Sequence, residues 1–162
     1  MAKKSPGGTP ATVALTRAGV AFTLHEYAHA PRATSYGSEA AEALGLDPDR
    51  VFKTLLAEVD GTLVVAVVPV AGWLDLKALA RALGGRKAAM ADPKDAERST
   101  GYVVGGIAPV GQKRRLPTVV DESATGYDVV YVSAGRRGLD LGIAPADLVA
   151  VTGAITADVS RS

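Results

Sequence analysis

Cysteine is absent from the 162 residues of this chain. Its absence excludes disulfide bonds, thiolate metal sites and a thiol nucleophile carried by the protein, and it fits a reducing cytoplasmic setting. Any reaction that needs a thiol must therefore take it from a substrate. Histidine is scarce as well, with only His25 and His29. Their spacing suits a metal ion only on a helix, whereas this segment is predicted to be a strand and a loop, so we expect no metal and no other cofactor.

Long apolar runs and an excess of one charge sign are also missing. No segment approaches the roughly 18 apolar residues of a membrane span, and no apolar stretch follows the lysines of the opening "MAKKSPGGTP". We expect no membrane partner and a flexible start over residues 1–8. The formal net charge is +1, far from the basic excess of a protein that holds nucleic acid by bulk electrostatics. No DNA partner is expected, and RNA binding would need local patches of charge.

The rest of the chain has the composition and length of one globular domain. Hydrophobic residues make up 48% of the sequence, and a domain of this size buries roughly two-thirds of the surface of its unfolded chain. No internal repeat of about 20 to 50 residues appears. We therefore expect a single domain over residues 9–162.

Short helices are predicted at intervals along the chain. Thr9 and Pro10 have the form of an N-cap and a first helical residue, and this helix should end at Gly19. Further helices are predicted over residues 38–45, within 74–85, from Asp92 and from Pro145.

Strand signals lie between these helices. Residues 20–27 alternate, with Val20, Phe22 and Leu24 on one side and Thr23, His25 and Tyr27 on the other. Residues 51–70 form two β-rich runs joined by Asp60-Gly61, a pair favoured in tight antiparallel hairpins. Other strands are predicted at 118–121, at 129–133 and near 154–159. The order lacks a regular βαβ rhythm, which favours an α+β fold with a curled, mainly antiparallel sheet.

The stretch "STGYVVGGIAPVGQKRRLP", residues 99–117, places four glycines and three consecutive cations between two apolar runs. The spacing from Gly106 to Gly111 is that of a phosphate-binding P-loop, but Gln112 stands where the lysine belongs and Arg114 where Ser or Thr belongs. Two interpretations remain open. The glycines either let main-chain N–H groups hold a carbonyl or oxyanion, or they form a structural loop.

Charged and nucleophilic side chains each allow two interpretations. Lys113, Arg114 and Arg115, with Arg136 and Arg137, form either a solvated edge or a surface for an anionic partner such as RNA. Lys53 shares a strand face with Val51 and Leu55. It is either a charged residue that protects a sheet edge from pairing with another chain, or a cation that points into a pocket. Ser133 and Asp140 could belong to a Ser–His–Asp arrangement, but no pattern places a histidine beside them and G-x-S-x-G is absent. Trp73 is interpreted as a packing residue.

Several ordered blocks resemble one known family. They are "FTLHEY", "VFKTLL", "VVPVAGWLDLKALARALGGRKAAMADP", "STGYVVGGIAPVGQKRRLPTVVDE" and "YVSAGRRGLDL". Together they resemble the bacterial YbaK family of Cys-tRNA(Pro) deacylases, part of the superfamily of editing domains associated with aminoacyl-tRNA synthetases. The resemblance runs from about residue 9 to residue 159. It implies a compact α+β domain around a twisted, barrel-like mixed sheet.

The resemblance also implies a site and a reaction. Lys53 would be the essential lysine, and the aminoacyl pocket would be lined by Tyr27, Gly105, Gly106, Ser133 and Asp140. The implied reaction is hydrolysis, in trans, of Cys-tRNA(Pro), which prolyl-tRNA synthetase makes by mistake because cysteine is close to proline in size. In the mechanism proposed for the family, the substrate's own thiol attacks the ester. The protein would then supply positioning and oxyanion stabilisation rather than a nucleophile.

Partners and rival functions follow from the same resemblance. The expected partners are aminoacylated tRNA(Pro) and prolyl-tRNA synthetase in a ternary complex, with the cations at 113–115 and at 136–137 meeting the tRNA. A cytoplasmic location is expected. The alternatives are a deacylase for alanine or another small amino acid, a non-catalytic module that binds aminoacyl ends, and a structural interaction protein. In the last case Lys53→Ala would change only surface charge.

Overall fold

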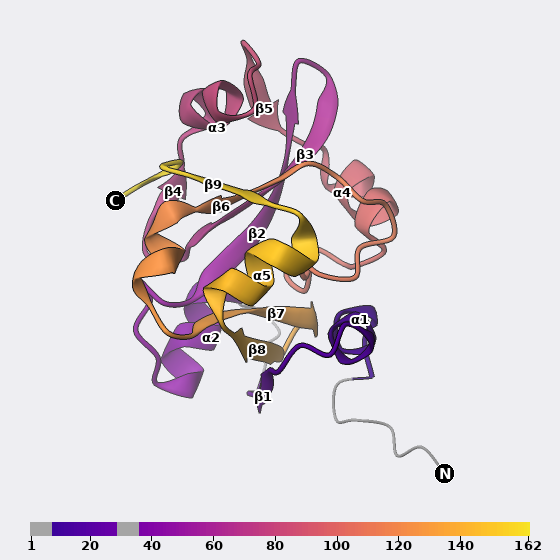
Figure 1. The fold of residues 1–162 in the computed structure, drawn as a ribbon, viewed down its shortest axis with the longest axis vertical. Helices are drawn as coiled ribbons and strands as arrows, with labels where there is room; N and C mark the ends of the chain where they lie inside the picture. Colours follow the sequence, from indigo (N-terminus) through magenta and orange to yellow (C-terminus); the bar gives the residue numbers. More distant parts are fainter. Residues whose placement is uncertain (1–7, 29–35) are drawn as a thin grey trace.

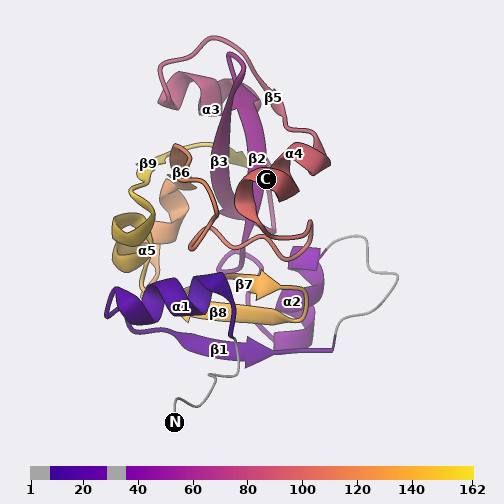
Figure 2. The same ribbon diagram turned by 90° about the vertical axis from the view of Figure 1, so that its right-hand side faces the viewer.

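The computed structural model describes residues 8–28 and 36–162 and arranges them around three β-sheets (Figures 1 and 2). The largest sheet has the strand order β5-β2-β3-β6-β9. Its members are β2 (Phe52–Val59), β3 (Thr62–Pro69), β5 (Ala88–Met90), β6 (Thr118–Asp121) and β9 (Ile155–Ala157). Strand β2 pairs antiparallel with β3 and β5, whereas β3–β6 and β6–β9 are parallel. The large sheet is therefore mixed.

Two smaller antiparallel sheets complete the β-structure. The first has the order β1-β8-β7, formed by β1 (Thr23–Glu26), β7 (Val130–Arg136) and β8 (Leu139–Ile143). The second pairs β4 (Trp73–Leu74) with β10 (Ser160–Arg161). A single parallel bridge between Val51 and Tyr131 joins the first of these sheets to the large one. The predicted α+β fold with a mainly antiparallel mixed sheet is confirmed.

Helices pack around these sheets. They are α1 (Pro10–Arg17), α2 (Tyr36–Leu44), α3 (Leu76–Ala82), α4 (Pro93–Thr100) and α5 (Pro145–Thr152), with a 3₁₀ helix, η1, at Glu122–Gly126. Helices α1, α4 and α5 begin at the predicted positions, whereas α2 begins at Tyr36, before its predicted start at residue 38. Thr9 Oγ1 accepts from Thr12 N at 3.2 Å, and Asp75 and Asp92 cap α3 and α4 in the same way. In Figure 2, α1 runs alongside β7 and β8, with α4 nearer β2. No helix of the described chain is long and apolar enough to cross a membrane.

Both faces of the large sheet are buried, each against its own hydrophobic cluster. Along β3, Val65 and Val67 face one cluster, whereas Val64, Ala66 and Val68 face the other. The first cluster continues into the β1-β8-β7 sheet, α1 and α5, and the second continues into α3 and the C-terminal segment. A strand buried on both faces has no polar side, which explains why β3 is a continuous apolar run rather than an alternating one.

Some predicted boundaries were wrong, and four strands were missed. The predicted strand over residues 20–27 is confirmed only over Thr23–Glu26, as β1, and the strands β4, β5, β8 and β10 were not predicted. Strand β8 lies in the centre of its sheet and is buried throughout, although its Leu139, Leu141 and Ile143 alternate with Asp140 and Gly142. Its Gly142 also resembles a loop residue, yet a Cβ there would lie 2.7 Å from Thr23 Oγ1. Trp73, interpreted as a packing residue, is 58% exposed, so it does not belong to the core.

The β2–β3 hairpin turn is anchored by Asp60. Asp60 and Gly61 both have positive φ, at 50° and 83°, which is the geometry whose twist matches antiparallel strands. The Asp60 carboxylate also accepts from the main-chain N–H groups of Arg86 and Lys87, each at 3.0 Å. These bonds tie the turn to the segment that enters β5.

We predict that Asp60→Ala lowers the free energy of unfolding by about 1 to 2 kcal/mol, because it removes both acceptors and places a residue that disfavours positive φ in the turn. Asp60→Asn is the matched control. It tolerates positive φ and keeps one carbonyl oxygen, so it should lose distinctly less. Urea unfolding of the three proteins measures the difference, and equal destabilisation by both replacements would contradict this role of the Asp60 carboxylate.

Candidate active site

A pocket of about 390 Å³ opens beside β2. Its walls come from β2, the residue after β1, the loop from 104 to 107, β7, β8 and the segment that leads from β5 into α4. Five of the six residues predicted for the aminoacyl pocket line it, although they are far apart in sequence: Tyr27, Lys53, Gly105, Ser133 and Asp140. The sixth, Gly106, is not a lining residue.

Lys53 lies on the pocket wall and its amino group is held in place. Its Nζ donates to the main-chain oxygen of Gly72 at 2.9 Å. Alternation along β2 directs the side chain to the face of Leu55 and Ala57, and the side chain is partly buried. Burial lowers the pKa of the Lys53 ammonium below its usual value. Of the two sequence interpretations, the structure has the lysine in a pocket and not at a solvated sheet edge.

Asp140 is a nearly buried carboxyl group in the same pocket. It is 5% exposed, and burial raises its pKa to about 7. Tyr27 also lines the pocket, and burial, followed by the charge of Asp140, raises the pKa of its hydroxyl to about 12. The Tyr27 hydroxyl therefore keeps its proton at neutral pH, whereas Asp140 is divided between its two forms. Perturbed groups of this kind are typical of functional sites.

The small sheet places Ser133, Asp140 and His25 side by side. Asp140 is the Cα partner of Ser133 on one flank and of His25 on the other. No sequence pattern placed a histidine beside Asp140, and the structure places His25 there. The order is Ser–Asp–His, however, with the carboxyl in the middle, and His25 Nε2 bonds Thr23 Oγ1 at 2.8 Å instead. A histidine there cannot take the proton of Ser133, so this row is not a catalytic triad.

The glycine-rich loop is firmly held against the β7–β8 turn. A Cβ on Gly106 would lie 2.8 Å from main-chain atoms of Arg136 and Arg137, so only glycine fits. The Gly106 N–H donates to Val103 O at 2.9 Å. Next to it, Val104 N donates to Glu97 Oε2 at 2.8 Å, and the Val104 oxygen accepts from the Arg137 guanidinium. The role of Gly106 in this structure is close packing, whereas Gly105, with φ 91°, lines the pocket.

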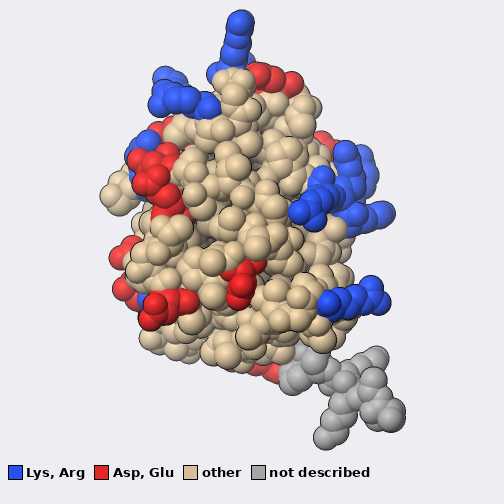
Figure 3. All heavy atoms as spheres, viewed as in Figure 1, with Lys and Arg blue, Asp and Glu red and all other residues tan. Residues whose placement is uncertain are grey.

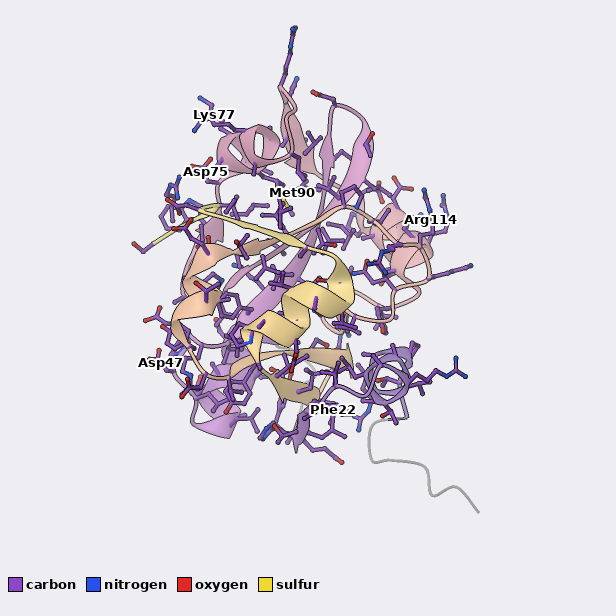
Figure 4. The ribbon with its side chains drawn as sticks, in the orientation of Figure 1. Phe22, Asp47, Asp75, Lys77, Met90 and Arg114 are labelled. Carbon is purple, nitrogen blue, oxygen red and sulfur yellow. The ribbon has the colours of Figure 1, made fainter. Side chains whose placement is uncertain are left out.

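The five candidate tRNA-contacting cations are all exposed but fall into two places. Arg136 is the last residue of β7 and Arg137 begins the turn into β8, both against the pocket loop; the Arg136 guanidinium lies 4.0 Å from the Glu26 carboxylate. Arg114 and Arg115 line a separate hollow of about 220 Å³ next to the C-terminal end of α5, and Lys113 precedes them. On the face shown in Figure 3, basic side chains gather on the side where Figure 4 labels Arg114, and many acidic ones gather toward Asp47 and Asp75.

Sequence reasoning missed several residues of the pocket. Thr54 follows Lys53, and its Oγ1 is buried without a hydrogen-bond partner among the described residues. Ser38 and Met90 also line the pocket, together with an apolar wall that includes Phe52 and Leu56. Thr54 carried no signal, because a threonine in a β-rich run is ordinary. In the described ranges, no group of three or more acidic, His or Cys side chains could hold a metal; His29 lies outside them.

The structure defines a class, a small α+β domain with a pocket beside β2, and comparison with known proteins supplies the family. Residues 29–151 match the family model of the aminoacyl-tRNA editing domain. The chain belongs to this family. The resemblance to YbaK-type editing proteins is thereby confirmed, since the chain is also 38% identical over 159 residues to EbsC of Enterococcus faecalis, covering 98% of this chain and 96% of EbsC. That protein is provisionally named a Cys-tRNA(Pro)/Cys-tRNA(Cys) deacylase.

Two further relatives connect the domain with prolyl-tRNA synthetases. A crystal structure provisionally described as a trans-editing enzyme for prolyl-tRNA synthetase superposes with a TM-score of 0.83 and 30% identity, over 98% of this chain and 99% of that one. The proline–tRNA ligase of Moorella thermoacetica is 34% identical over 110 residues, which are 61% of this chain but only 19% of the ligase. Part of this chain thus corresponds to a small section of a much larger enzyme.

The raised pKa of Asp140 predicts a pH-dependent stability. The folded chain keeps to about pH 7 a proton that the unfolded chain releases near its ordinary pKa of 3.8. The stabilisation is therefore complete below about pH 4 and is lost as the pH rises through about 7. Relative to Asp140→Asn, we expect the wild type to lose up to about 4 kcal/mol between these limits.

Urea unfolding at several pH values measures this difference. Asp128→Asn is the control, because the side chain of Asp128 is exposed and its replacement should leave the pH profile unchanged. Parallel profiles for the wild type and Asp140→Asn would show that Asp140 does not carry the proton.

Proposed function

We propose that this chain is a trans-editing deacylase that hydrolyses the ester bond of Cys-tRNA(Pro). The observation that carries the proposal is the pocket itself, which gathers a held lysine, a buried carboxyl and a tyrosine hydroxyl in a chain that has no cysteine. Membership of the editing family and the similarity to EbsC support an aminoacyl-tRNA as the substrate class. The relation to prolyl-tRNA synthetases supports tRNA(Pro).

Each polar group then has a task that its environment suits. Lys53, oriented by the Gly72 carbonyl, supplies positive charge to the ester or to the terminal ribose–phosphate. Asp140, when ionised, accepts from the α-ammonium of the aminoacyl group, and Tyr27 and Ser133 complete the polar wall. The apolar residues of the pocket exclude water and accommodate a small side chain.

The substrate's thiol supplies the nucleophile. Its sulfur forms a bond to the ester carbonyl carbon, and the carbonyl π electrons move onto the oxygen. When the carbonyl re-forms, the ester C–O bond breaks, and the terminal ribose oxygen leaves with the proton that the thiol gave up. The cyclic thiolactone that results is opened by water to free cysteine. The protein contributes position and charge, which is what a pocket without a nucleophile of its own can offer.

The tRNA is selected by the basic surface of this chain together with a second protein. The exposed cations at 113–115 and 136–137 contact the tRNA, and prolyl-tRNA synthetase in a ternary complex provides selectivity for tRNA(Pro). A net charge of +1 supports this division of labour, because it favours only weak binding of RNA by the isolated chain.

The central prediction concerns Lys53 and the identity of the amino acid. We expect rapid release of cysteine from Cys-tRNA(Pro) and little release from Ser-tRNA(Pro) or Ala-tRNA(Pro), since serine has a poor nucleophile of nearly the same size. Lys53→Ala should slow cysteine release at least about 100-fold. The rates are measured with purified protein and radiolabelled aminoacyl-tRNA.

Lys77→Ala is the matched control, because Lys77 is an exposed lysine on α3 that does not line the pocket (Figure 4). It should leave the rate unchanged. Equal release of all three amino acids would refute attack by the substrate's thiol, and preference for alanine would identify a sister deacylase. Binding without turnover would instead indicate a non-catalytic module. The same assay with Cys-tRNA(Cys) measures whether the protein distinguishes one tRNA from another.

A second prediction tests the basic surface. Replacing Lys113, Arg114 and Arg115 by Gln should weaken tRNA binding and flatten its dependence on salt, by about 0.7 to 0.9 in the log–log slope for each phosphate that the variant no longer binds. The control replaces Lys77, Arg81 and Arg86, which changes the net charge equally at another place on the surface. Fluorescence anisotropy with labelled tRNA measures both. Identical slopes in the two triple variants would rule out a specific role for residues 113–115.

A further inference from the structure

Strand β2 leaves part of its main chain unpaired inside the pocket. Two hydrogen bonds set the pattern: just before β2, Val70 N donates to Val51 O, and within β2, Ala91 N donates to Leu56 O. Hydrogen-bonding residues alternate along a strand, so the odd-numbered residues of β2 bond β3 and the even-numbered ones point to the opposite edge. Thr54 therefore directs its N–H and C=O away from β3.

On the edge that the Thr54 main chain faces, no strand of the described chain pairs with β2 at this residue. Strand β5 pairs only with residues 57–59 of β2, and the bridge to β7 is at Val51. Between them, the described chain has no further strand pairing or bridge to β2 on that edge, although β7 runs close to it. The pocket is lined by every residue from 51 to 56, from both faces of the strand, which is possible only for a cavity that lies against its edge.

The side chain of Thr54 also lacks a hydrogen-bond partner. Its Oγ1 is the one buried side-chain oxygen of the described chain that lacks a hydrogen-bond partner. A buried hydroxyl without a hydrogen-bond partner lowers the stability of the fold. Packing alone therefore does not explain a threonine at this position. By contrast, the N–H of Gly106, a candidate oxyanion donor from sequence, already donates to Val103 O.

We propose that Thr54 provides the main-chain N–H and hydroxyl donors that receive the ester carbonyl oxygen of the aminoacyl group as it becomes an oxyanion. The inference rests on the proposed deacylase function and names a residue for it. A donor pair of this kind stabilises the charge that appears on oxygen when the carbonyl π electrons move there, and releases it when the ester C–O bond breaks. Lys53, the preceding residue, adds its positive charge from one face of the strand.

Thr54→Val tests the hydroxyl, because valine keeps the shape and removes the donor. We expect kcat for Cys-tRNA(Pro) to fall about 10- to 100-fold with KM nearly unchanged, since the oxyanion exists only in the transition state. The Tm should stay the same or rise, because the variant removes a buried hydroxyl that lacks a partner. Thr54→Ser keeps the donor and should retain kcat within a few-fold.

Replacing the main-chain N–H of Thr54 by an ester oxygen, through incorporation of the α-hydroxy analogue of threonine, tests the second donor. This change should lower kcat and leave the Tm nearly intact, because the N–H has no partner in the ladder. The same replacement at Leu55, whose N–H points to β3, is the control and should lower the Tm instead.

The outcomes separate this inference from the function on which it rests. A fall in kcat at Thr54 with an unchanged Tm supports the donor pair. Wild-type kcat in both Thr54→Val and the ester variant, or a fall in kcat that only follows a falling Tm, overturns it while the deacylase function stands. If the wild-type protein hydrolyses no aminoacyl-tRNA, the proposed function fails first.

Discussion

The incomplete pairing of β2 is the constraint on which the rest of the site depends. On one edge, β3 pairs with β2 along its whole length. On the other edge, β5 covers only residues 57–59, and a single bridge at Val51 reaches the small sheet. A gap in a sheet leaves polar main-chain groups that water, a ligand or another segment must satisfy. In this chain the gap opens into a pocket that other segments surround.

Burial in that pocket explains the electrostatics of the site. The pKa of Lys53 is lowered and that of Asp140 is raised, and desolvation is the leading cause of both shifts. Each shift therefore moves its group toward the neutral form. The fold tolerates these costs because the hydrophobic clusters on the two faces of the large sheet are extensive, and the first of them also supplies apolar residues of the pocket wall, such as Phe52 and Leu56. A stable core therefore permits polar groups without hydrogen-bond partners at its edge.

Much of the fold was predictable because its signals are local. The N-caps at Thr9 and Asp92 and the Asp60-Gly61 turn depend only on near neighbours, and all are present in the structure. Strand β8 was missed although its five residues alternate between apolar and polar or glycine. Its place at the centre of a sheet, buried on both faces, comes from partner strands in distant parts of the chain.

The candidate site was likewise predictable only in part. The sequence alone determined the absence of a thiol nucleophile and, through resemblance, the set Tyr27, Lys53, Gly105, Ser133 and Asp140 that lines one pocket. Only the tertiary structure decided that Gly106 is a packing residue, that His25 lies beside Asp140, and that Thr54 faces an unpaired edge. The physical reason is that close approach, register and strand pairing are relations between distant segments, which no residue's local pattern records.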